Sequence, residues 1–301
     1  MFVCQQYCIF KHNSRICCIR GAMQLIYTWD DATARWLQEK ASKQSLVTDK
    51  VLIRWLDSHL SGVPLQDIDR SVVSFLAHKK IATGVTNATV NRMLSFLRAL
   101  LNMAALDWDW LPSSPKVRLL REPTRRIRYL KKTEAVRLLR ELPEHLSAMA
   151  AFSLATGLRR ANVTGLEWSQ VDMSRQLAWI HADQAKAGRS LAVPLNTDAM
   201  RVLLTRVGRH PKYVFSYQGE RVTQVSTAAW YKALKRAGIS DFRWHDLRHT
   251  WASWHVQNGT PLFALQELGG WGSTEMVRRY AHFSVGNLVS YASNLPTFSG
   301  P

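Results

Sequence analysis

The chain has 301 residues, of which 47% are hydrophobic and 12 are tryptophan, enough apolar material to build the cores of two domains. Lys and Arg number 40 against 22 acidic residues, and this formal charge of +18 favours a partner with dense negative charge, nucleic acid first. No apolar run reaches the length of about eighteen residues that a membrane span needs, and no secretory signal pattern opens the sequence. We therefore expect a cytoplasmic protein.

The positive charge is unevenly distributed along the chain. Residues 1–115 hold 13 basic and 9 acidic side chains, whereas residues 116–301 hold 27 and 13. We expect the second part of the chain to hold most of the phosphate of a nucleic-acid partner.

All four cysteines lie at the N-terminal end, which excludes a disulfide-built fold for the rest of the chain. Cys4, Cys8, Cys17 and Cys18 lack the paired C-x-x-C or His spacings that zinc sites normally carry. We interpret residues 1–24 as a disordered leader, translated from upstream of Met23, in preference to a small metal knuckle.

Residues 25–111 show the apolar periodicity of an all-helical bundle. Three short helices are predicted after Trp29, and a fourth, longer helix from about Thr86. One buried stripe marks this fourth helix, formed by Val90, Met93, Leu94, Leu97, Leu100, Leu101 and Ala104.

The helical pattern stops at Pro112, and residues 112–132 are predicted to form a basic linker between two domains. Residues 116–132 carry eight basic side chains against one acid, Glu122. A solvated charge run and a linker that joins two domains around a nucleic-acid duplex fit this composition equally well.

A second domain is predicted over residues 133–301, with Thr133 as the N-cap of its first helix. Alternating β-formers at 177–181 and 190–195 flank Gly188 and predict a β-hairpin. Helices resume near Thr197 and again from 226 onward. The expected fold class is mainly α with a small antiparallel β-sheet.

Residues suited to phosphodiester chemistry gather in separated segments of this second domain. They are Ala155-Thr156-Gly157-Leu158-Arg159, Lys186 in the hairpin turn, His245-Asp246-Leu247-Arg248, Leu268-Gly269-Gly270-Trp271, and Tyr280-Ala281-His282. On a helix, the spacing of the third segment places His245 and Arg248 on one face.

Cutting a phosphodiester without a metal requires groups that hold the nonbridging oxygens while negative charge builds on them. Arg159 and Arg248 suit this task, because a guanidinium is planar, permanently charged and donates in pairs. A nucleophile must also attack phosphorus. Tyr280 can do so when surrounding cations favour its phenolate.

Proton transfer and further phosphate contacts are assigned to three other residues. Lys186 can protonate the departing 5′ oxygen from the hairpin tip, and His245 can exchange the proton of the nucleophile or bind the phosphate. Trp271 offers one indole N–H to a phosphate oxygen.

In order and spacing, these segments resemble the signature boxes of the tyrosine recombinases, the phage integrase family. The resemblance is strong over 133–285 and weaker over 25–111, where 89–104 is similar to the last helix of the family's core-binding domain. It implies a C-shaped clamp of two domains, a helical SAM-like core-binding domain and a catalytic domain. The active site that it implies consists of Arg159, Lys186, His245, Arg248, Trp271 and Tyr280.

The sequence departs from the family pattern in two places. Asn162 stands where the family often has Glu, which puts a supporting hydrogen bond in doubt, and Trp271 fills a position that is more commonly His. The residues before Met23 are too few to form the additional arm-binding domain of the larger phage members.

The resemblance implies a site-specific recombinase of a prophage or other mobile element, which works through a 3′-phosphotyrosine intermediate without cofactor, metal or ATP. The expected partners are double-stranded DNA, further copies of the chain in a homotetramer on two DNA sites, and an accessory DNA-bending protein. Two alternatives stay open, a type IB topoisomerase and a noncatalytic DNA-binding relic of a mobile element.

Several neighbouring residues have simpler interpretations. Arg160 and Arg279 are read as surface phosphate contacts or solvated charges, and His249 as structural or supporting. His245 and His249 have the spacing of a zinc pair on a helix, but Arg248 between them would set a cation beside the metal.

Overall fold

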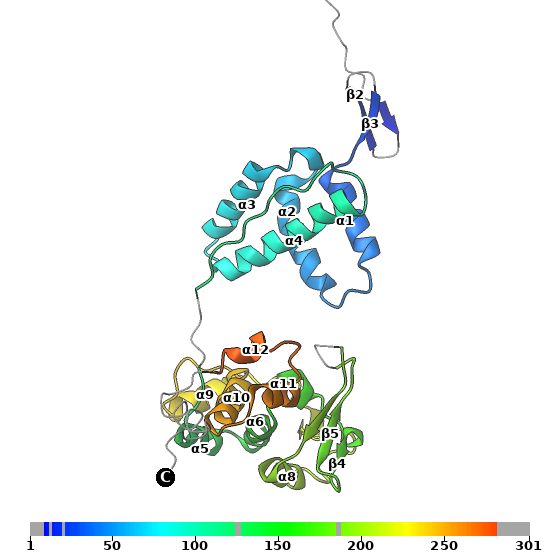
Figure 1. Cartoon of the computed structure of the whole chain (residues 1–301). Coiled ribbons are helices and arrows are strands. Elements are labelled where there is room, and N and C mark those ends of the chain that lie inside the picture. The colour runs from blue at the N-terminus through cyan, green and yellow to red at the C-terminus, as the bar shows by residue number, and fades with distance from the viewer. Residues whose placement is uncertain (1–8, 12–13, 20–21, 124–127, 185–187, 282–301) are drawn as a thin grey trace, which may run out of the picture. The chain divides into compact units, whose positions relative to one another are not determined.

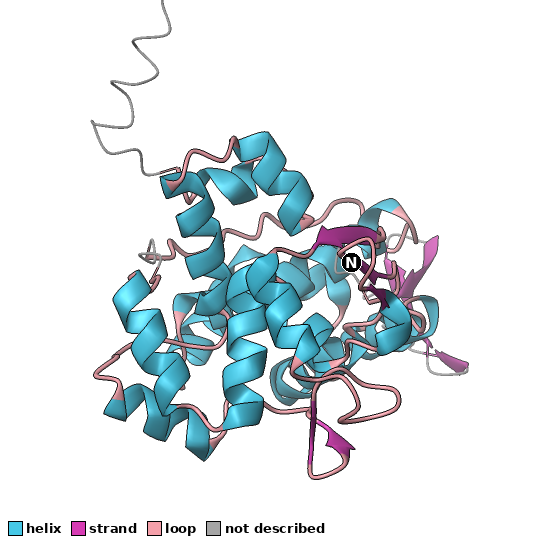
Figure 2. Ribbon diagram, turned by 90° about the horizontal axis from the view of Figure 1, so that it is seen from below, coloured by secondary structure: helices cyan, strands magenta, loops and turns pink. Residues whose placement is uncertain are grey.

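The computed structural model describes residues 9–11, 14–19, 22–123, 128–184 and 188–281. The chain divides into two compact units, residues 1–124 and 125–301 (Figure 1). Helices make up most of both units (cyan in Figure 2). Within the described residues, no helix is both long and apolar enough to cross a membrane.

The first unit begins with a three-stranded antiparallel sheet, β1 (Ile9–Lys11), β2 (Ser14–Ile19) and β3 (Ala22–Ile26). The backbone register pairs Ile16 with Leu25, so each strand satisfies the backbone groups of its neighbour. The interpretation of residues 1–24 as a disordered leader did not anticipate these strands. The stretch is short and carries no clear alternation of polar and apolar residues.

Four helices follow: α1 (Trp29–Glu39), α2 (Leu46–Leu60), α3 (Arg70–Ala82) and α4 (Asn87–Leu106), with the short 3-10 helix η1 (Leu65–Asp67) between α2 and α3. Thr28 and Asp31 form a capping box that starts α1, and Asp69 caps α3 through two backbone N–H groups. The predicted stripe of α4 is buried throughout and forms the centre of this core.

The first half of the predicted linker packs on the first unit. Val117 is buried in its core. Asn91 of α4 accepts a hydrogen bond from the Leu120 N–H at 2.7 Å and donates through Nδ2 to the Leu120 carbonyl at 2.9 Å. Apolar residues scattered through the basic sequence thus anchor it to the helices.

The second half belongs to the other unit. Leu130 is fully buried there; its N–H donates to Thr250 Oγ1 at 3.0 Å, and its carbonyl accepts from Trp254 Nε1 at 2.9 Å. The first helix of this unit begins at Lys132, ahead of the predicted cap at Thr133, because Glu134 accepts the Lys131 N–H at 2.7 Å.

The second unit is mainly helical with a small antiparallel sheet, as the sequence predicted. Its helices are α5 (Lys132–Glu141), α6 (Glu144–Thr156), α7 (Arg160–Thr164), the 3-10 helix η2 (Trp168–Gln170), α8 (Thr197–Leu204), α9 (Ala228–Arg236), α10 (Asp246–Gln257), α11 (Leu262–Gly269) and α12 (Glu275–Arg278). Its strands are β4 (Val171–Asp172), β5 (Leu177–Ile180), β6 (Leu191–Pro194), β7 (Ser216–Tyr217) and β8 (Glu220–Arg221).

Helix α6 is the central element of this unit. It is buried on nearly every side and contacts α5, α8 and α10. The sheet has the strand order β4-β5-β6, and the pairing of Ala178 with Val193 confirms the predicted hairpin. This packing fixes the ends of α6 and α10, where the candidate site residues lie.

Candidate active site

The bend that carries Arg159 depends on a glycine. Helix α6 ends at Thr156, and Gly157 follows in the left-handed region at φ +65°. A Cβ atom at Gly157 would lie 2.2 Å from the ring of Trp251, so a side chain is excluded on two grounds. Arg159 comes two residues later as the N-cap of α7, and its side chain is half-buried.

Arg248 on α10 is the most deeply buried cation of the site, with 4% of its surface exposed. Its Nη1 donates to the carbonyl of Gly157 at 2.6 Å, and its Nη2 to the carbonyl of Gly269 at 2.5 Å. These carbonyls lie at the C-terminal ends of α6 and α11, where helical carbonyls lack an intrahelical partner and the helix dipole is negative. They therefore stabilise a guanidinium that is almost completely removed from water.

The second guanidinium lies against the same helix end. Arg159 Nη2 is 3.5 Å from the carbonyl of Gly270, the C-cap of α11. Burial lowers the pKa of Arg159, and burial followed by the charge of Arg159 lowers the pKa of Arg248 to about 10. Both side chains stay charged at neutral pH. Among the described residues neither forms an ion pair with an acid, so the arrangement can bind an anion.

Tyr280 follows α12 and lies within the electrostatic reach of Arg248. Its side chain is 5% exposed and packs in one cluster with Trp251 and Val277. Burial raises the pKa of Tyr280, whereas the charges of Arg248 and Arg279 lower it. The phenol is therefore protonated in the free protein and lies beside cations that favour its ionised form.

The hydroxyl of Tyr280 has a specific partner. His249 Nδ1 lies 2.6 Å from Tyr280 Oη. Burial lowers the pKa of His249 to about 4, and the positive charges of His245, Arg279 and Arg248 act in the same direction. The imidazole is therefore neutral at pH 7.

Trp271 lies next to the guanidinium of Arg248, whose Cζ is 4.1 Å from the centre of the indole. The same indole stacks on Trp251 at 6.0 Å between ring centres. A Cβ at Gly269 would come within 1.9 Å of Trp271, so the glycine permits this approach. The expected contact between the indole N–H and a phosphate oxygen stays a prediction.

The remaining predicted residues are placed as follows. His245 is exposed at the N-terminal end of α10, with its ring 4.9 Å from that of His249. Lys186 lies outside the described residues. Its hairpin lies close to the site, because Leu191 of β6 would be 3.2 Å from a Cβ placed on Gly270. Asn162 is buried on α7.

Arg159, Arg248, Trp271 and Tyr280 thus lie around the C-terminal end of α11. His249 had no predicted chemical role, although its spacing of four residues from His245 predicted a shared helix face. Its contact with Tyr280 joins segments 31 residues apart and is visible only in the tertiary structure. In the described part of the chain, no cluster of three or more metal-ligating side chains occurs.

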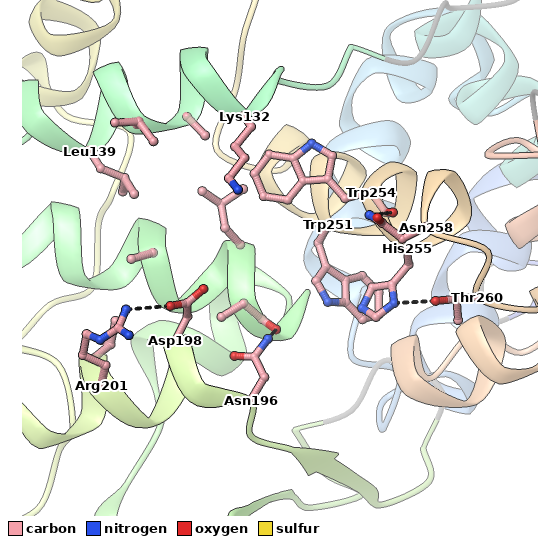
Figure 3. Close-up of a pocket in the computed structure, with 16 residues that line it drawn as sticks. Lys132, Leu139, Asn196, Asp198, Arg201, Trp251, Trp254, His255, Asn258 and Thr260 are labelled. Atoms are coloured by element: carbon pink, nitrogen blue, oxygen red, sulfur yellow. Dashed lines mark hydrogen bonds and ion pairs between the residues drawn. The ribbon is translucent and has the colours of Figure 1, made fainter.

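A separate pocket of about 690 Å³ lies between α5, α6, α8 and α10 (Figure 3). Its lining includes Asn196, Trp254 and His255, which bonds Thr260 Oγ1 at 2.9 Å. Of the predicted catalytic residues that the structure describes, none lines it. Trp251 belongs to both this pocket and the candidate active site. It lines the pocket, and its ring also contacts Gly157 and the ring of Trp271.

The sequence of this chain is similar to those of known integrases and recombinases. The family model "Phage integrase family" matches residues 128–286. The integrase of Salmonella phage P22 is 40% identical, over 91% of this chain and 81% of that protein. The shufflon-specific DNA recombinase of Escherichia coli is 32% identical, over 68% of this chain and 54% of that protein.

Solved structures show the same fold. The integrase of transposon Tn1549, in complex with a circular intermediate DNA, superposes with a TM-score of 0.76 at 17% identity, over 88% of this chain and 98% of that chain. A lambda integrase dimer bound to a COC′ core site gives 0.69 at 20% identity, over 83% and 97%.

Proposed function

The chain belongs to the phage integrase family and is a site-specific DNA recombinase, and we propose that Tyr280 is the nucleophile with which it cuts and rejoins strands. Tyr280 Oη attacks phosphorus, a 3′-phosphotyrosyl bond forms, and the bond from phosphorus to the 5′ oxygen breaks. A 5′ hydroxyl of the partner strand then attacks the same phosphorus and releases the tyrosine. One phosphate ester replaces another at each step, so no ATP is consumed, and we propose that no metal takes part.

The observation that carries this proposal is the pair of guanidinium groups, which have no acidic partner among the described residues. Arg159 and Arg248 converge on the C-terminal end of α11, and the charge of Arg248 acts on the pKa of Tyr280. A phosphate bound there would receive two permanent cations where its negative charge grows during attack.

The other groups have supporting roles in this proposal. Lys186 delivers a proton to the departing 5′ oxygen, and exposed His245 binds the phosphate from the N-terminal end of α10. Trp271 holds the Arg248 guanidinium against its ring and donates its indole N–H to a phosphate oxygen.

The proposed assembly is a homotetramer on two double-stranded DNA sites, with both units of each copy closing on the duplex and an accessory protein bending the DNA. A lambda integrase tetramer bound to a Holliday junction has the same fold, with a TM-score of 0.70 at 20% identity. The names of the relatives favour a phage or another mobile element as the origin.

Covalent capture tests the nucleophile. DNA carrying the target site, identified from direct repeats that flank the gene, is nicked beside the cleavage position so that the freed fragment diffuses away. We expect a denaturation-resistant adduct with the wild-type protein, none with Tyr280→Phe, and an undiminished adduct with Tyr231→Phe, an exposed tyrosine of the same unit. An adduct that survives Tyr280→Phe would refute the assignment.

A second readout addresses the two alternatives. Joined products from two DNA sites support recombination, and relaxation of a single plasmid without joined products would support a topoisomerase. Specific DNA binding without any adduct would support a noncatalytic relic.

A further inference from the structure

The hydrogen bond between His249 and Tyr280 has no role in the mechanism above. The bond joins α10 to the segment after α12, with 2.6 Å between Nδ1 and Oη. The two ring centres are 5.7 Å apart, and Arg248 is the neighbouring residue in the chain. Any inference from this contact rests on the proposed function, since it concerns the nucleophile of that reaction.

The protonation states define the direction of this hydrogen bond. Both groups are neutral at pH 7, because burial lowers the pKa of His249 to about 4 and raises the pKa of Tyr280. A phenol is a much stronger acid than a neutral imidazole N–H. The Tyr280 hydroxyl therefore donates, and Nδ1 accepts with its lone pair while the ring proton sits on Nε2.

We propose that His249 is the proton acceptor for Tyr280 during strand cleavage. As the bond from Oη to phosphorus forms and the bond from phosphorus to the 5′ oxygen breaks, the hydroxyl proton passes to Nδ1. The 5′ oxygen takes its own proton from a different acid, Lys186 in the proposed mechanism. In the joining step His249 returns its proton to Tyr280 as the tyrosine leaves.

The charges around His249 couple this step to the presence of DNA. His245, Arg248 and Arg279 all disfavour an imidazolium at His249, and Asp246 is the acid whose charge acts on Tyr280. A phosphate bound to Arg159 and Arg248 offsets these positive charges. His249 then accepts a proton more easily when a substrate phosphate is bound. Without a bound phosphate, Tyr280 stays protonated.

His249→Asn distinguishes proton transfer from simple positioning. Asparagine places a polar atom near the position of Nδ1 and can accept the hydrogen bond, but it cannot take the proton. The matched control is His255→Asn on the same helix, where the histidine is also partly buried and bonded to Thr260. Denaturation midpoints verify that the variants fold, and His249→Gln replaces the asparagine variant if that one does not.

The measurement is the single-turnover rate of adduct formation on nicked target DNA. We expect His249→Asn to slow it about 100-fold at pH 7, with unchanged DNA affinity, and His255→Asn to leave it unchanged. The deficit should shrink as pH rises, because hydroxide then removes the phenol proton. A rate within about threefold of wild type for a folded His249→Asn would overturn the proposal and leave His249 with a positioning role at most.

A modified substrate separates the two proton transfers. When sulfur replaces the bridging 5′ oxygen, the leaving group needs no acid, so the defect of Lys186→Ala should be relieved and that of His249→Asn should persist. Relief of the His249→Asn defect by sulfur would contradict the proposal. Absence of any wild-type adduct at Tyr280 would refute the proposed function itself, which is a different outcome from a wild-type rate in His249→Asn.

Discussion

At the scale of single residues, both the backbone conformation and the packing of the site depend on Gly157. Its left-handed φ of +65° and the Trp251 ring, which would lie 2.2 Å from an added Cβ, both exclude a side chain. The bend that Gly157 allows directs Arg159 toward the end of α11. The carbonyl of Gly157 accepts a hydrogen bond from Arg248.

We predict that Gly157→Ala lowers the free energy of unfolding of the second unit by more than about 2 kcal/mol, because a steric clash adds to the backbone cost. Adduct formation should be lost as well. Gly208→Ala is the matched control, since φ there is +77° and no atom lies within 4 Å of the added Cβ. It should cost only about 1 kcal/mol. Equal losses in denaturant titrations of the two variants would show that the Trp251 contact is unimportant.

His249 gives the second unit an acid-sensitive contribution to stability. Its folded pKa of about 4 lies below the ordinary value of 6.5. Between these values the unfolded chain binds a proton that the folded chain does not. The contribution is therefore complete above about pH 6.5, decreases as pH falls toward 4, and is constant below that.

We predict that His249→Asn loses less stability than wild type between pH 7 and about pH 4.5. The shift corresponds to at most about 3 kcal/mol, and solvent screening of the partly exposed ring reduces this. Denaturant titrations across this pH range measure it. Parallel curves for the two proteins would contradict the lowered pKa.

At the scale of elements, long amphipathic segments were predictable and short ones were not. The apolar stripe predicted from Val90 to Ala104 is buried in α4, and the predicted hairpin is formed by β5 and β6. Helices α7 and α12 have five and four residues, too few to display a period. Tertiary contacts determine their positions, so the local sequence gives no signal for them.

The packing of the basic segment between the units was likewise not predictable from the local sequence. The charge density of this segment fitted a solvated charge run and a linker around a duplex equally well, and gave no sign that Val117 packs in one core and Leu130 in the other. These isolated apolar residues follow no periodicity. The side chains of Asn91 and Thr250 accept hydrogen bonds from the N–H groups of Leu120 and Leu130, and such partners cannot be inferred from the local sequence.

We predict that Asn91→Ala destabilises the first unit by about 1–3 kcal/mol, because it removes both hydrogen bonds to the backbone of Leu120 in a buried place. Faster hydrogen exchange of the Leu120 amide should accompany this loss. Asn87→Ala is the control, since its half-buried side chain makes a single, exposed hydrogen bond to the Arg121 carbonyl. It should change stability by about 0.5 kcal/mol or less. An unchanged amide exchange rate in Asn91→Ala would contradict the anchoring role.

The residues of the candidate site could be selected from the sequence, but not all of their contacts. The order of the motifs pointed to Arg159, Arg248 and Tyr280, which the fold brings to the end of α11. The partner of the Tyr280 hydroxyl was missed, because the local sequence does not distinguish His249 from other helical histidines. Only the tertiary structure brings Tyr280 into contact with it.

At the scale of the whole molecule, we expect the charge of +18 to dominate association with DNA. Phosphate contacts by Lys and Arg release condensed counterions, so affinity should fall steeply with salt. We predict a loss of about 1,000-fold or more between roughly 50 and 200 mM salt, for both target and unrelated DNA. Fluorescence anisotropy titrations measure it. An affinity that changes less than about tenfold over this range would mean that few phosphates are contacted.

Arg248 links the C-terminal ends of α6 and α11, which are far apart in the sequence. Its Nη1 donates to the carbonyl of Gly157 and its Nη2 to the carbonyl of Gly269. During synthesis on the ribosome, a chain that has not yet reached residue 269 lacks the Gly269 carbonyl and also Tyr280. The contacts of Arg248 with both carbonyls, and the position of Tyr280 beside it, can therefore form only after residue 280 has been synthesised.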